Sequence, residues 1–179
     1  MDKKIKDLAN QNTSIRYLII TAICIACGIA LPQAFHVIAF ESAGKVFLPM
    51  HIPILICGFL CGWKYGLLCG LITPFLSSFT GMPQLFPTAV WMMFELAAYG
   101  CISGLLYKKY NAFISLIGAM FCGRVVLAIT QFIIFSMIGQ SFDLRVFLVS
   151  TFGTAIPGIF LQIIVIPALI KVLHKVGYI

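Results

Sequence analysis

Long apolar runs, separated only by short polar or basic turns, restrict what this chain can fold into more than any other feature. Of its 179 residues, 61% are hydrophobic and only 9% are charged. Soluble domains usually carry about 25% charged residues, so this chain has too few polar side chains to cover a water-facing surface. Together with a mean hydropathy of +1.08, this composition predicts a protein whose solvent is lipid.

Six runs are candidates for membrane-spanning helices, each of which needs roughly 20 predominantly apolar residues. The runs cover residues 16–35, 52–63, 65–80, 88–107, 112–138 and 147–173. The first run is too long and too internal for a cleaved signal peptide. Only Trp63 and Lys64 separate the second run from the third, so a re-entrant hairpin is the alternative there. The predicted fold class is an all-α membrane protein, a bundle of six transmembrane helices.

The positions of lysine and arginine predict the orientation, because cytoplasmic segments of membrane proteins carry an excess of these residues. With the N-terminus inside, nine of the 12 lie in inner segments, Lys45 and Arg145 lie in outer loops, and Arg124 lies within the fifth run. Both termini are then cytoplasmic, with 1–15 as an N-terminal segment and 36–51 as an outer loop or lid. The basic residues flank the runs, so the net charge of +7 indicates topology and no nucleic-acid partner.

Glu95 and Arg124 are ionisable residues well inside apolar runs. Each costs at least about 2.5 kcal/mol at the bilayer centre, so a partner or a polar cavity is expected. At 1.5 Å per residue, Glu95 lies roughly 12 Å and Arg124 roughly 9 Å from the outer side of the membrane. The two side chains can therefore meet, either as a structural salt bridge or around a polar ligand, and both possibilities stay open.

Further polar and aromatic residues are predicted to surround this pair. Trp91 and Tyr99 lie one turn before and one turn after Glu95, and Gln131 shares the helical face of Arg124. Aromatic rings, amides and charges that converge in this way would suit a small polar ligand with apolar parts. The predicted substrate-binding residues, including two from the outer loops, are Glu95, Arg124, Trp91, Tyr99, Gln131, Gln162, Gln84 and His51.

No motif for catalysis, a cofactor or a metal is found. The chain contains no phosphate-binding glycine loop, no Ser-His-acid arrangement and no His-Glu-x-x-His sequence. Cys24 and Cys27 form a C-x-x-C pair, but it lies in an apolar run with no second pair in a polar turn. Buried free thiols usually serve as small packing residues. We therefore expect no enzymatic activity, no cofactor and no metal.

Small residues recur at four-residue spacing, which gives a helix a smooth strip that a second helix can approach closely. Ala22, Ala26 and Ala30 form such a strip on the first helix. It could serve packing within the bundle or docking of a partner, and the residues alone favour internal packing. A glycine series with the same spacing, from Gly58 to Gly70, crosses the turn between the second and third runs. This series predicts close packing between those two helices.

Three stretches, together with the alanine strip, the size and the six runs, point to a known family. They are F-L-P-M-H-I-P-I-L at 47–55, K-Y-G-L-L-C-G-L-I-T-P-F-L-S-S-F-T-G-M-P at 64–83, and F-E-L-A-A-Y-G at 94–100. With these features the chain resembles the substrate-binding S components of energy-coupling factor (ECF) vitamin importers. The resemblance extends over nearly the whole chain.

The resemblance implies a single S-component-like transmembrane domain over 1–179, in a bacterial plasma membrane. Such a protein captures a water-soluble vitamin or precursor in an outward pocket beneath the first loop. It carries no ATPase and docks on a coupling subunit driven by two cytoplasmic ATPases, with the alanine strip as the docking face. Pantothenate is the predicted substrate because Arg124 could pair with its carboxylate, while cobalamin, pyridoxine, folate and queuosine precursors stay open.

Two alternative functions from other classes of protein remain open. A self-sufficient secondary transporter would use Glu95 and Arg124 as a relay, and a membrane scaffold would only assemble partners. A relay should support uptake without any ATPase, whereas a scaffold should bind nothing small. One Glu–Arg pair gives no continuous polar path across the membrane, which disfavours the relay.

Overall fold

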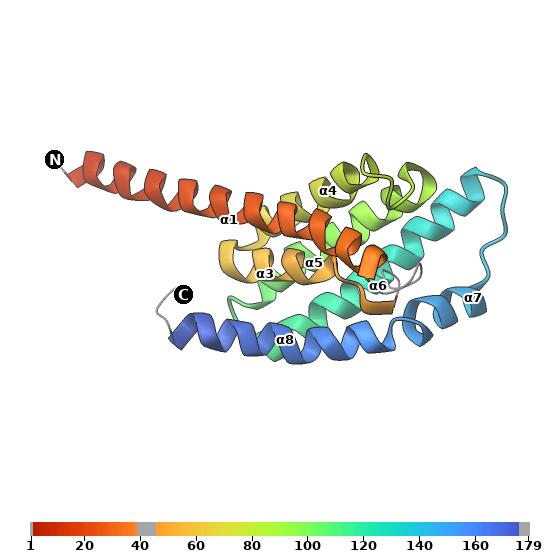
Figure 1. Cartoon of the computed structure of the whole chain (residues 1–179). Coiled ribbons are helices and arrows are strands. Elements are labelled where there is room, and N and C mark those ends of the chain that lie inside the picture. Colours follow the sequence, from red (N-terminus) through yellow and green to blue (C-terminus); the bar gives the residue numbers. More distant parts are fainter. Residues whose placement is uncertain (1, 39–45, 176–179) are drawn as a thin grey trace.

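The computed structural model describes residues 2–38 and 46–175, and the regular structure in these residues is helical. The elements are α1 (Asp2–Ile38), α3 (His51–Cys61), α4 (Trp63–Ser78), η1 (Leu85–Ala89), α5 (Val90–Leu106), α6 (Ala112–Met137), α7 (Leu144–Leu148), η2 (Val149–Gly153) and α8 (Ile156–Lys175). Figure 1 shows the long helices packed side by side as a bundle. The start of α1 and the end of α8 lie at one end of this bundle, and α7 lies at the other.

Within the described residues, four helical segments are long and apolar enough to cross a membrane. These segments are Thr13–Phe35, Leu85–Leu106, Ala112–Met137 and Ile156–Leu173. Helices α3 and α4 have 11 and 16 residues, so they extend for about 16 and 24 Å in a hydrocarbon core about 30 Å thick. Each of the six predicted runs contains a helix, which supports a helical membrane protein. The number of spans and the cytoplasmic location of the termini stay predictions.

The turn between α3 and α4 lies at Gly62, one residue earlier than predicted, since Trp63 and Lys64 already belong to α4. Gly62 has a φ of +84°, a left-handed conformation that glycine adopts without steric cost. Its N–H donates to the Gly58 carbonyl at 3.0 Å and its carbonyl accepts from the Gly66 N–H at 3.0 Å. One residue therefore ends one helix and begins the next.

The predicted sixth run, 147–173, is wrong at its outer end, because the helix is broken at Thr154 and Ala155. Helix α7 and the π-helical segment η2 precede this break, and α8 begins at Ile156. The Asp143 side chain caps α7 by accepting from the backbone N–H of Arg145 at 2.7 Å. The break could not be predicted from the continuous apolar composition, because apolar residues are compatible with two short helices as well as with one long helix.

Glycines bring α3, α4 and α5 together backbone to backbone. A Cβ added to Gly66 would lie 2.8 Å from the Gly58 Cα and 2.7 Å from the Gly100 carbonyl carbon. One added to Gly70 would clash with the Leu96 backbone. The predicted packing of the glycine series between α3 and α4 is therefore only part of its role. The same glycines also pack against α5. Gly100 of α5 lies at the point where the three helices meet.

Helix α1 packs on this core with one face. Thr21, Cys24 and Gly28 are buried, and Thr21 Oγ1 lies 3.5 Å from Cys57 Sγ. The opposite face of α1 is exposed and includes Cys27. The two cysteines of the C-x-x-C pair therefore have different surroundings, one in the core and one on the outer wall.

We predict that Gly100→Ala lowers the unfolding free energy by about 1–3 kcal/mol, the usual cost of overpacking a tight interface. A Cβ at this position would lie 2.9 Å from the Gly66 Cα, and backbone cannot rotate away. Thermal unfolding of the purified protein in detergent measures the loss.

Gly118→Ala is the matched control for this substitution. Its Cβ would meet only the Leu106 Cδ1 atom, at 2.5 Å, and that side chain can adopt another rotamer. Because alanine is the better helix former, the unfolding midpoint should stay constant or rise slightly. Equal losses for the two variants would contradict the tight contact at Gly100.

Candidate functional site

Glu95 of α5 and Arg124 of α6 form an ion pair in the interior of the bundle. Arg124 Nη1 donates to Glu95 Oε1 at 2.8 Å. The two residues are only 3% and 7% exposed. Their meeting agrees with the similar depths expected from sequence, and each charge compensates the other where lipid and protein offer no water.

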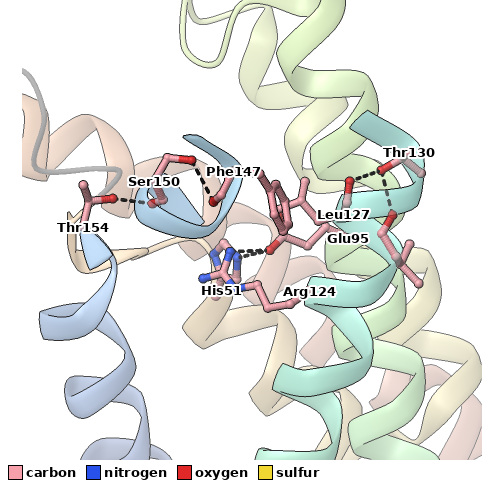
Figure 2. A network of polar contacts seen from close by, with 9 residues as sticks. His51, Glu95, Arg124, Leu127, Thr130, Phe147, Ser150 and Thr154 are labelled. Carbon is pink, nitrogen blue, oxygen red and sulfur yellow. Dashed lines mark hydrogen bonds and ion pairs between the residues drawn. The ribbon is translucent and has the colours of Figure 1, made fainter. Parts of the chain in front are cut away.

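His51, the first residue of α3, approaches the same carboxylate. Its Nε2 lies 3.6 Å from Glu95 Oε1, and the residue is 2% exposed. Figure 2 shows His51 and Arg124 directed toward Glu95 from two different helices. Three helices therefore each contribute one titratable or charged side chain to a single buried point.

Tyr99 supports this arrangement from one turn further along α5. Its ring meets the His51 ring edge-on, with centroids 5.0 Å apart and planes at 85°. Gly123 of α6 makes room for the ring, because a Cβ there would lie 2.5 Å from the Tyr99 Cδ2 atom. The residue next to Arg124 thus sets the distance between α5 and α6, and with it the geometry of the ion pair.

Several buried polar atoms of the bundle have no hydrogen-bond partner among the described residues. They include both ring nitrogens of His51, Nη2 of Arg124, and the amide oxygen and nitrogen of Gln162. A buried polar group without a partner costs roughly 1–3 kcal/mol. Such a group is usually found where something else supplies the missing hydrogen bond.

Gln162 of α8 is also completely buried. One turn before it, Gly158 lies against the backbone of Phe47, where a Cβ would lie 2.7 Å from the Phe47 carbonyl carbon. Phe47 in turn precedes His51 by four residues. Helices α3 and α8 are in contact, so Gln162 is a buried polar residue on a helix adjacent to the one that carries His51.

A chain of aromatic rings joins α5, α6 and α7, and it begins one turn before Glu95. Trp91 packs edge-on against Phe135 of α6, with centroids 5.6 Å apart. Phe135 contacts Phe142 at 6.4 Å, and Phe142 contacts Phe147 of α7 at 5.6 Å. Phe147 itself is buried, and Figure 2 shows it on the segment that carries Ser150 and Thr154. Phe147 was missed from sequence because it was placed at the start of a membrane span.

The remaining predicted site residues are less closely connected to the pair. Gln131 is half-buried on α6, and Gln84 is exposed just before η1. Among the hydrogen bonds of residues 13–35 and 46–173, none joins either glutamine to Glu95 or Arg124. Residues 39–45 of the predicted outer loop or lid lie outside the described residues.

Comparison with known proteins gives one match. A family model described as "ECF transporter, substrate-specific component" matches residues 16–173, which include every predicted site residue. No curated protein and no solved structure matches the chain.

We predict that Glu95→Gln and Arg124→Gln each lower the unfolding free energy by about 3–5 kcal/mol, because either change leaves an uncompensated buried charge. The double variant Glu95→Leu/Arg124→Met should recover most of this loss, since an apolar pair of similar size replaces a buried ion pair at little cost. Thermal unfolding in detergent measures all three.

Arg145→Gln removes an exposed charge and serves as the control, with an expected change below about 0.5 kcal/mol. A double variant whose loss equals the sum of the two single losses would show that the charges do not depend on each other.

Proposed function

Because the chain belongs to the family of substrate-specific components of ECF transporters, we propose that it captures a water-soluble vitamin or vitamin precursor. Membership makes it a multi-pass membrane protein and a transporter subunit. Within the proposal, capture takes place on the outer side of a bacterial plasma membrane. Delivery follows when the loaded protein docks on a coupling subunit driven by two ATPases.

The unpartnered buried atoms of His51, Arg124 and Gln162 carry the proposal of a ligand site. A salt bridge with a purely structural role would not require these unpartnered atoms. Arg124 uses Nη1 for Glu95 and keeps Nη2 for a second acceptor. A ligand with both donors and acceptors would satisfy the three side chains at once, which supports ligand binding as well as a structural role for the ion pair.

Pantothenate remains the proposed substrate within this class. Its carboxylate would accept from Nη2 of Arg124, and its amide and hydroxyl groups would complement the Gln162 amide and the Glu95 carboxylate. A guanidinium that bridges two carboxylates can bind each through a different nitrogen. Cobalamin, pyridoxine, folate and queuosine precursors are the competing substrates.

The alanine strip supports docking through α1. Ala22, Ala26 and Ala30 are all exposed, on the face opposite to the buried Thr21 and Gly28. Residues without bulky side chains let a second helix approach closely, and in lipid such packing drives association. The strip is not used for packing within the described bundle, which favours a partner over the internal role that the residues alone suggested.

For ligand binding, we predict a saturable change in the fluorescence of Trp91 on addition of pantothenate. The chain has 2 tryptophans, so the measurement uses the Trp63→Phe variant, in which Trp91 is the sole reporter. The double variant Glu95→Leu/Arg124→Met should lose at least about 30-fold in affinity, because it removes charge-assisted hydrogen bonds to the ligand.

Each of the competing vitamins is titrated in the same way. A response to another vitamin would replace pantothenate and keep the proposed class. Absence of a response to all of them, in protein whose unfolding midpoint is normal, would count against the proposed function.

For docking, we predict that Ala26→Trp abolishes co-purification with the coupling subunit and vitamin uptake, while ligand binding in detergent is unchanged. The indole would hold the partner helix away from α1. Ile133→Trp also places an indole at an exposed helix position, on α6, and should leave uptake intact.

Co-purification that survives Ala26→Trp would show that the docking face lies elsewhere. Uptake into proteoliposomes that contain this chain alone would instead support a self-sufficient transporter.

A further inference from the structure

An open hollow of about 460 Å³ lies at the end of the bundle opposite to the ion pair. The first turns of the α1 span, the α3–α4 turn and the end of α5 surround it, and in Figure 1 these segments lie toward the end that holds the start of α1. Tyr107, on its wall, follows Glu95 by twelve residues, or about 18 Å along α5. The hollow is therefore separate from the proposed vitamin site.

The chemistry of the hollow is basic and aromatic. Its lining includes two lysines and five aromatic residues, namely Lys64, Lys108, Tyr17, Phe59, Trp63, Tyr65 and Tyr107. No carboxylate of the described residues lines it. Neither Lys64 nor Lys108 takes part in an ion pair within the part of the chain that the structure describes, so both ammonium groups lack a carboxylate partner there.

The rings hold this lining in place. Lys64 Nζ lies 5.7 Å from the centroid of the Trp63 ring, within the range of a cation–π contact. The Tyr17 and Tyr65 rings meet edge-on at 5.5 Å and join α1 to α4. Both lysines are exposed, so their ammonium groups are accessible from outside the bundle.

The position along the helices indicates a membrane–water interface. Trp63 and Lys64 begin α4, and Tyr107 and Lys108 follow the last residue of α5. Tryptophan and tyrosine gather where the apolar core of a bilayer meets the headgroups, and lysine gathers on the cytoplasmic side. On the orientation that the lysine distribution predicts, the hollow opens to the cytoplasmic leaflet, whose surface is anionic.

We propose that this hollow binds the headgroup of an anionic phospholipid from the cytoplasmic leaflet. Lys64 and Lys108 hold the phosphate, while the aromatic rings contact the glycerol backbone and the upper acyl chain. A volume of about 460 Å³ falls in the range of small-ligand sites, which is roughly 300–1,000 Å³. A free phosphate ion would leave the apolar part of the lining unused, and a zwitterionic headgroup would bring its own cation next to the lysines.

Native mass spectrometry of the full chain in detergent, titrated with phosphatidylglycerol or phosphatidylcholine, tests the site. We expect phosphatidylglycerol to bind more tightly than phosphatidylcholine. The double variant Lys64→Gln/Lys108→Gln should weaken phosphatidylglycerol binding by about 30-fold, and either single variant by about 5-fold, as expected for the loss of one lysine contact each.

Lys171→Gln/Lys175→Gln is the matched control, because it removes two exposed lysines from α8, also on the predicted inner side but outside the hollow. It should leave lipid binding unchanged. An equal loss of phosphatidylglycerol affinity in both double variants would show that general surface charge causes the effect, and it would overturn the site. Unchanged binding in the first double variant would overturn it as well.

Two further results would also overturn the lipid assignment. One is equal affinity for phosphatidylcholine, and the other is displacement of phosphatidylglycerol by millimolar inorganic phosphate, which would indicate a free-anion site. The unfolding midpoint is measured on the same preparations, and vitamin binding to them is measured by calorimetry, which needs no Trp63→Phe substitution. Since neither depends on the hollow, failure of the lipid site and failure of the proposed vitamin binding are distinguishable.

Discussion

Backbone contact around Gly100 holds α3, α4 and α5 together, and the placement of the polar side chains depends on it. In lipid, apolar surface gains little from leaving the solvent, so helices associate where small residues allow close van der Waals packing. Gly58 and Gly66 reach the Gly100 backbone from two helices. This junction fixes α3 against α5, and therefore fixes His51 relative to Glu95. Helix α6 is then positioned by the Tyr99 ring resting on Gly123.

The charged residues at the two ends of the bundle have different surroundings. Toward α7, the charges are buried and must be compensated inside the protein, which the Glu95–Arg124 pair does at 2.8 Å. The polar atoms left over there are buried, and in a low-dielectric interior a hydrogen bond to a ligand is worth more than in water. At the opposite end, Lys64 and Lys108 are exposed, and no carboxylate of the described residues lies beside them, which is the basis for the proposed anionic lipid.

Much of the candidate site could be predicted from sequence because depth along a helix follows directly from residue number. Glu95 and Arg124 were expected at similar depths, and Tyr99 was expected one turn from Glu95. Gly62 was not expected as the turn, because a positive φ is a property of the folded backbone and glycine recurs through the whole series. Phe147 was missed because the apolar composition around it continues unbroken across the end of a helix at Thr154.

The sequence by itself determined that this chain belongs in a membrane, which runs contain apolar helices, and which charges are buried within them. These properties depend on composition and on a fixed rise per residue, so they need no knowledge of neighbours. Which helix faces which was decided only by the tertiary structure. The glycine series could have joined α3 to α4 alone, but the space left by its missing side chains is filled by α5. Which helix fills this space depends on how well surfaces from distant parts of the chain fit together. Residue spacing within one helix cannot predict that fit.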